Sequence, residues 1–194
     1  MVKSKVASLV LTLLVTSTLL VGCGDDNNKK AAAPPAQTQE QKTPQPTDEQ
    51  AEMKAWNDKM EKAAADYVNG VKTLMNPSLE ILGKQAASPE ELAQNYKTVY
   101  QNLKKLSNDL VNCEMMYREI QIPDGVSKKE QMTQVQNLYG DATKKYREGV
   151  DIMKLMTMKG QLNKTEMDKA TALFNEATNM FNDAHAKLQQ INNQ

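Results

Sequence analysis

The stretch that decides the fold is residues 132–156, MTQVQNLYGDATKKYREGVDIMKLM. Its apolar and small residues recur at alternating steps of three and four: Met132, Val135, Tyr139, Ala142, Tyr146, Gly149, Met153 and Met156. An α-helix has 3.6 residues per turn, so this spacing gathers all of them along one face. The stretch therefore predicts a long amphipathic helix that buries one seam against other helices.

Three more segments carry the same spacing. Their seams are Met53, Trp56, Met60, Ala63, Tyr67, Gly70 and Leu74; Leu92, Tyr96, Val99, Leu103, Leu106, Leu110, Cys113, Tyr117 and Ile120; and Met167, Ala170, Phe174, Ala177, Phe181, Ala184, Leu188 and Ile191. Helices of about 30 residues would each run roughly 45 Å, and short breaks between them favour antiparallel neighbours. We therefore predict that residues 48–194 form an all-α domain, an antiparallel up-down-up-down four-helix bundle.

Signals for helix ends agree with the seams. Four pairs have the spacing of a capping box, in which a polar side chain and the residue three positions later satisfy each other's backbone amides. They are Thr47 with Gln50, Ser88 with Glu91, Ser127 with Glu130 and Asn163 with Glu166. Glycine and proline predict breaks at residues 122–125 and 160–162. Pro77 leaves two outcomes open, because it either kinks the first helix or opens a short separate one.

The first 23 residues have a different character. Two lysines precede an apolar run over residues 6–21, and Leu20-Val21-Gly22-Cys23 closes it. A charged start, an apolar stretch and small residues at a cut site are typical of a secretory signal peptide. The tetrapeptide resembles the lipobox of bacterial lipoproteins, and this resemblance covers residues 1–23 only. It implies that residues 1–22 are removed and that Cys23 becomes the lipidated first residue of the mature chain.

Residues 23–47 predict a flexible tether behind that cysteine. They contain four prolines and almost no large apolar side chain, so they cannot bury enough surface to offset the entropy of ordering. As a flexible coil they would span roughly 25–30 Å. An uncleaved anchor is the alternative, but a transmembrane helix needs about 20 apolar residues. The run over residues 6–21 is shorter and is interrupted by serine and threonine, so we expect attachment to a membrane face through lipid on Cys23.

Composition excludes several function classes. The 24 basic and 24 acidic side chains balance, and no block of like charge predicts binding to nucleic acid. Beyond Cys23 the remaining cysteine is Cys113, whose seam position predicts a packed side chain rather than a reactive thiol. The chain has no glycine-rich phosphate loop, nucleophile elbow or zinc-ligand spacing, so we expect no enzymatic activity.

A haem site is one candidate for the bundle interior. Four-helix b-type cytochromes hold haem between a methionine near the start of the first helix and a histidine near the end of the last. Met53 and His185 resemble that pair, and in an antiparallel bundle both positions are expected at a similar level. His185 is the only histidine, so a metal site built on several histidines is excluded. Our prediction is that neither residue binds a cofactor.

Methionine clusters and small seam residues suggest two further interior sites. The clusters are Met115-Met116 and Met153, Met156 and Met158, and thioethers bind Cu(I). Two of these methionines fall on the predicted seam, where methionine is a pliable packing residue, so we predict no metal there. Small residues such as Gly149 either allow tight packing or leave room for an apolar ligand.

Together these features predict a lipid-anchored helical bundle outside the cytoplasm, on the cell membrane or outer membrane of a bacterial envelope. We expect a non-enzymatic binding or scaffold module with an envelope protein as partner. Its contact surface is expected on the polar outer faces or at an exposed seam edge, such as Trp56 or Tyr100. The alternative is a carrier of haem, Cu(I) or lipid in the bundle interior.

Overall fold

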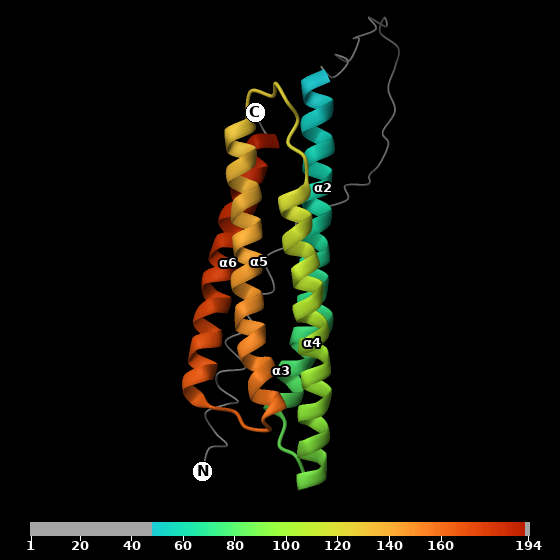
Figure 1. The fold of residues 1–194 in the computed structure, drawn as a ribbon, viewed down its shortest axis with the longest axis vertical. Coiled ribbons are helices and arrows are strands. Elements are labelled where there is room, and N and C mark those ends of the chain that lie inside the picture. Colours follow the sequence, from blue (N-terminus) through green and yellow to red (C-terminus); the bar gives the residue numbers. More distant parts are fainter. Residues whose placement is uncertain (1–47, 193–194) are drawn as a thin grey trace, which may run out of the picture.

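The structure is a computed structural model that describes residues 48–192. Its elements are α2 (Asp48–Gly70), the π-helical segment η2 (Val71–Met75), α3 (Asn76–Gly83), α4 (Pro89–Glu119), α5 (Lys129–Met158) and α6 (Lys164–Asn192). The first three follow one another directly, so residues 48–192 form four long helices and no strand. Successive long helices run in opposite directions (Figure 1). The predicted up-down-up-down four-helix bundle is confirmed.

The first long helix widens into a π turn just before Pro77. At the end of η2, the Asn76 N–H bonds to the carbonyl of Val71, five residues back instead of four. A proline ring in a regular α-helix clashes with the carbonyl four residues earlier, and the wider π turn relieves this crowding. Helical conformation therefore continues through the proline to Gly83, so Pro77 opens no detached helix.

Two of the predicted caps form. The Glu91 N–H donates to Ser88 Oγ at 3.1 Å, and the Glu91 carboxylate accepts from the N–H of Ala87 in return. At the start of α6, the Glu166 N–H donates to Asn163 Oδ1 at 3.2 Å. Each bond satisfies an amide that has no partner inside its own helix.

The cap predicted at Ser127 is wrong. Helix α5 begins two residues later, at Lys129, and its N-terminal end has no side-chain cap. The N–H and hydroxyl of Ser127 both donate to Glu49 Oε1 of α2 instead, at 2.7 Å each. A carboxylate brought in by the fold has displaced the local partner, Glu130. Thr47, the residue of the remaining predicted cap, lies outside the described residues.

The four seams meet in one core. Every seam residue predicted for α5 and α6 is buried, as is the middle of the seams of α2 and α4. Six rings form a continuous chain through this core, with neighbouring centroids 4.7–5.5 Å apart: Tyr117, Tyr139, Phe181, Tyr67, Tyr146 and Phe174. Aromatic pairs at such distances add about 0.5–1.5 kcal/mol each beyond the area they bury, so this chain of rings ties all four helices together.

Small residues bring α5 and α6 close together. A Cβ placed on Gly149 would lie 2.5 Å from Cε1 of Phe174, closer than real Cβ contacts allow. The Phe174 ring therefore fills the space that a larger seam residue would take. Of the two outcomes that the sequence left open for Gly149, tight packing is the one observed.

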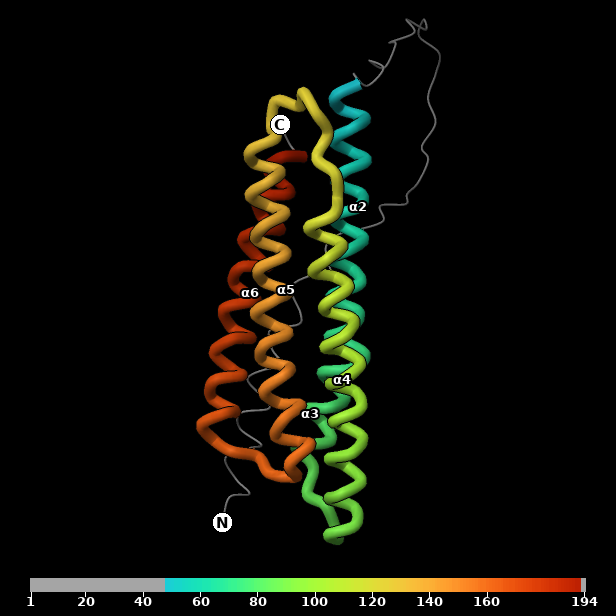
Figure 2. Tube along the Cα trace, viewed as in Figure 1, coloured from blue at the N-terminus to red at the C-terminus, as the bar shows by residue number. Residues whose placement is uncertain are grey.

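Helix α4 extends beyond the end of α5, and its first turns project from the bundle (Figure 2). Leu92, predicted as a buried seam residue, is 44% exposed there. That prediction is wrong because the seam of α4 starts before α5 is present to cover it. The projecting turns lie at the end of the bundle opposite Asp48, the first described residue (Figure 1).

Candidate functional site

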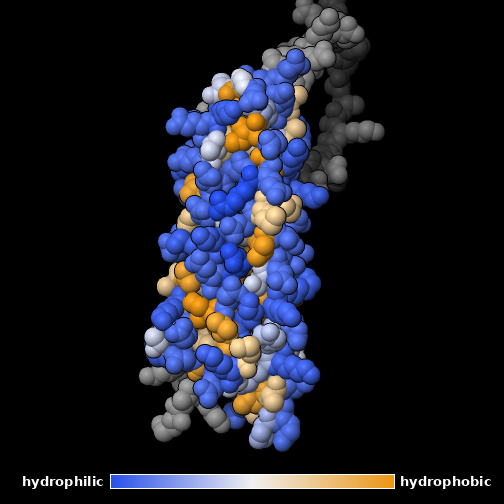
Figure 3. Space-filling model, in the orientation of Figure 1, coloured by the Kyte–Doolittle hydropathy of each residue, from blue (hydrophilic) through white to orange (hydrophobic). Residues whose placement is uncertain are grey.

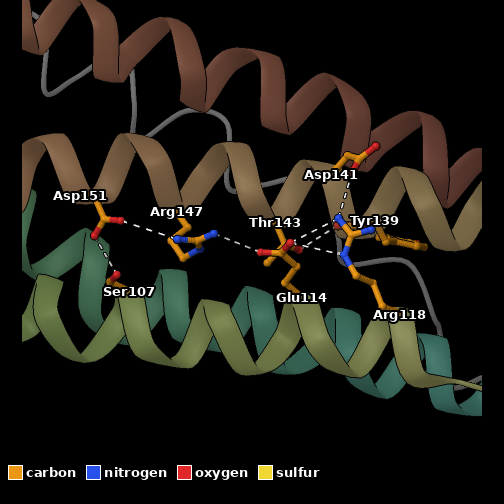
Figure 4. A network of polar contacts seen from close by, with 8 residues as sticks. All are labelled: Ser107, Glu114, Arg118, Tyr139, Asp141, Thr143, Arg147 and Asp151. Carbon is orange, nitrogen blue, oxygen red and sulfur yellow. Dashed lines mark hydrogen bonds and ion pairs between the residues drawn. The ribbon is translucent and has the colours of Figure 1, made fainter.

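A row of polar contacts joins α4 to α5 (Figure 4). Glu114 of α4 accepts from Arg118 and from Arg147 of α5, at 3.3 Å in each case. Farther along, the Ser107 hydroxyl donates to Asp151 at 2.8 Å. The carboxylates of this row already have cationic or hydroxyl partners, so the row fixes the alignment of two helices and presents no unpaired nucleophile.

The described residues contain no group of three or more His, Cys, Asp or Glu side chains placed to hold a metal ion. The methionine clusters do not gather into a site either. Met153 and Met156 are buried in the core, whereas Met158 is 57% exposed at the end of α5. Met115 is exposed on α4. These thioethers lie in different environments and do not converge on one point.

The structure does not bring Met53 and His185 together. Asn192 of α6 hydrogen-bonds Asn57 of α2 at 3.0 Å, which aligns the two helices. Met53 lies about one turn beyond Asn57 and His185 about two turns back from Asn192, so the pair is separated by about 16 Å along the axis. Both residues cannot bind one haem iron at that separation.

His185 has other partners. Its Nδ1 lies 3.3 Å from the hydroxyl of Tyr139, and its Nε2 lies 3.1 Å from the side-chain nitrogen of Gln189. Met53 lines a pocket of about 550 Å³ at the end where α2 begins, together with Ser127 and Ile191. The two candidate haem ligands therefore serve separate local contacts.

Cys113 is packed in the core, as its seam position predicts, and only 5% of its surface is exposed. Burial raises the pKa of its thiol to about 11, and the nearby carboxylates of Asp66 and Asp109 act in the same direction. The thiol is therefore protonated at neutral pH and is a poor nucleophile. Cys23, the predicted lipidation site, lies outside the described residues.

Trp56 and Tyr100, predicted as examples of an exposed seam edge, differ in their outcome. Trp56 is 2% exposed and lies in the core, so it is not a contact surface. It is buried because the seam of α2 faces the core of the bundle from Trp56 onward. Tyr100 is half-buried and lines a groove at the projecting end of α4.

We call this feature the end groove. It has a volume of about 530 Å³ and is lined by Pro89, Leu92, Ala93, Tyr96, Lys97 and Tyr100 of α4 and by Thr157, Met158, Lys159 and Gly160 at the end of α5. Five large hydrophobic residues of the described chain are markedly exposed, and two of them, Leu92 and Met158, line this groove. Figure 3 shows hydrophobic surface at the corresponding lower end of the molecule. Leu155, 49% exposed, lies one turn before Met158 on α5.

Unpaired positive charge borders the end groove. Twelve ion pairs occur among the described residues, but the ammonium groups of Lys97 and Lys159 take part in none of them. Sequence reasoning missed the groove because it assigned Leu92 to the core. The sequence carried no signal for it, because the periodicity of the α4 seam does not determine where α5 ends beside α4.

Comparisons with known proteins add no relative. No protein-family model, curated protein or solved structure matches this chain. Among the helices of residues 48–192, none is long and apolar enough to span a membrane.

Proposed function

We propose that the protein is a non-enzymatic binding module of the bacterial cell envelope, lipid-anchored through Cys23 and binding an envelope protein partner through the end groove. One observation carries the proposal. The chain from Cys23 enters the bundle at Asp48, and the end groove lies at the opposite end. The bundle thus separates its point of attachment from an exposed groove that contains Leu92 and Met158.

The dimensions suit a spacer. The first long helix runs from Asp48 to Gly83, which corresponds to about 54 Å at 1.5 Å per residue. Held at a membrane face by Cys23, a bundle of this length carries its far end well clear of the lipid headgroups. A partner in the space beyond the membrane is therefore within reach of the end groove.

The side chains of the groove suit a protein partner. Four of its ten lining residues are large and apolar or aromatic, namely Leu92, Tyr96, Tyr100 and Met158, and aromatic residues and methionine are enriched where proteins meet. The groove is open to solvent between α4 and the end of α5, in contrast to an enclosed cavity for a small molecule. At the level of Gly149, the core is filled by Phe174, and this filling speaks against a carrier with its ligand at that level.

The anchor is tested by acyl labelling in a host that lipidates proteins. We expect an alkyne-tagged palmitate to label the intact chain and the Cys113→Ala variant, and not the Cys23→Ala variant. The Cys113→Ala protein is the matched control, because it removes the other cysteine. Persistent labelling of Cys23→Ala would show that the lipobox assignment is wrong.

The binding surface is tested by photocrosslinking in the same host. A photoreactive residue replaces Ala93 in the end groove or, as a control, exposed Lys62 on α2. We expect an adduct heavier than the monomer at position 93, lost when Leu92→Glu is added, and no such adduct at position 62. Equal crosslinking at both positions, or none at position 93, would remove the end groove as the binding surface.

A further inference from the structure

The end groove is complementary to the helix end that forms it. We propose that its occupant is the first turns of α4 from a second copy of this chain, so that two bundles pair end to end as an antiparallel two-fold dimer. This inference rests on one part of the proposed function, namely that the end groove is the binding surface. It does not depend on the lipid anchor.

The shape of the groove calls for a helix. Its α4 wall presents Pro89, Ala93, Tyr96 and Tyr100 at steps of three and four, the spacing with which the rest of α4 packs against α5. Helix α5 ends at Met158, so within residues 48–192 no further helix lines this face. Ridges at such spacing fit the grooves of another helix.

The charge of the groove restricts which helix fits. Lys97 and Lys159 border it without an ion-pair partner among residues 48–192. The occupant should therefore carry carboxylates beside an apolar seam. The first turn of α4 has this pattern, because exposed Glu90 precedes Leu92 and Ala93. Helix α4 thus supplies both the basic groove and an acidic helix end.

A two-fold arrangement satisfies both requirements at once. In a two-fold interface, residue i of one copy meets residue j of the other and the reverse contact also forms. An antiparallel crossing centred between Ala93 and Gln94 sets Glu90 of each copy opposite Lys97 of the other. Leu92 of each copy then lies near Tyr96 of the other. Two ion pairs therefore flank an apolar contact that covers the exposed seam.

The contact is short, which sets its expected strength. The overlap covers residues 89–98, about 15 Å of helix, and is small beside the interfaces of stable dimers. We expect a concentration-dependent dimer with a dissociation constant on the order of 10–500 µM.

Complementary charge variants test the pairing. We would measure sedimentation velocity of the unlipidated chain from residue 24 onward, which contains the whole bundle, between 10 µM and about 1 mM. Lys97→Glu and Glu90→Lys each replace two attractions by two repulsions, so each alone should weaken the dimer about tenfold. An equimolar mixture of the two variants should associate again, because each copy then carries the charges that the other lacks. Lys62→Glu is the control and should leave association unchanged.

Restored association in the mixture supports the second copy, provided that both variants keep the circular dichroism and unfolding transition of the parent. A protein that stays monomeric at the highest concentration overturns the inference, and so does a dimer that both charge variants leave intact. If the monomer persists while Ala93 still crosslinks to a different envelope protein, the inference fails and the proposed function stands.

Discussion

Replacing Gly149 by alanine should destabilise the bundle, although alanine is the better helix former. The added Cβ would lie 2.5, 2.9 and 3.0 Å from three atoms of the Phe174 ring. The ring is 2% exposed and packs against Tyr146 with centroids 4.7 Å apart, so turning it away from the added Cβ would disrupt that contact. Helices α5 and α6 must separate slightly, or the ring must leave its preferred position.

Two opposing effects set the magnitude. Overpacking a well-filled core costs about 1–3 kcal/mol, and the distances at Gly149 place this substitution toward the upper end. Exchange of glycine for alanine inside a helix offsets about 1 kcal/mol. The net loss in the free energy of unfolding should be about 1–2 kcal/mol, a decrease in Tm of several degrees for a domain of this size.

Urea unfolding followed by circular dichroism measures the effect, with Gly140→Ala on the same helix as the matched control. A Cβ at Gly140 meets Arg118 Cζ at 3.5 Å, an ordinary contact, so that variant should gain about 0.5–1 kcal/mol from helix propensity. Adding Phe174→Leu should cost less in the Gly149→Ala protein than in the parent, because the smaller side chain relieves the clash. A Gly149→Ala protein at least as stable as the parent would refute the close approach of α5 and α6.

Three further predictions concern single polar groups. Glu114→Gln should lower the free energy of unfolding by about 1 kcal/mol, and 1 M NaCl should reduce the difference in this free energy between the variant and the parent. Equal stability of the two proteins at low salt would show that the polar row between α4 and α5 contributes nothing to stability. Hydrogen bonds from Ser127 lower the pKa of Glu49, so the link between them should be present above pH 4.5 and be lost as pH falls through the lowered pKa. The protection factor of the Ser127 amide against hydrogen exchange should fall in that range in the parent, whereas Glu49→Gln should show no such pH dependence. Cys113, with its thiol pKa raised to about 11, should react with Ellman's reagent at pH 8 only as fast as the bundle opens, and rapid stoichiometric reaction without urea would contradict its burial.

The sequence predicted the features that depend on short spacing. The seams of α5 and α6 are fully buried, because a pattern that holds one face over thirty residues leaves little choice of which side turns inward. The Ser88 cap formed for the same local reason, since both partners lie within one turn. Ser127 had an equally good local pattern, but its amide and hydroxyl donate instead to Glu49, which is distant in sequence. Which of two good partners wins is decided by the tertiary arrangement.

The features that depend on the axial offset between helices could not be predicted from the sequence pattern. Placing Met53 and His185 at one level assumed that the ends of the first and last helices are aligned. The contact between Asn57 and Asn192 shows that α2 begins beyond the end of α6. Leu92 was assigned to the core by the same assumption about α4 and α5. Periodicity determines which face of a helix is buried, but it carries no information on axial offset.

The polar row between α4 and α5 explains why the projecting end of α4 stays uncovered. Sliding α4 by one turn, about 5.4 Å, to bring Leu92 under α5 would separate Glu114 from Arg147. It would also separate Ser107 from Asp151, leaving half-buried charges without partners, a larger penalty than exposure of one leucine. The register that satisfies these groups therefore leaves the end groove open. The groove is a consequence of how α4 and α5 are locked together, and a variant that shifts this register should remove it.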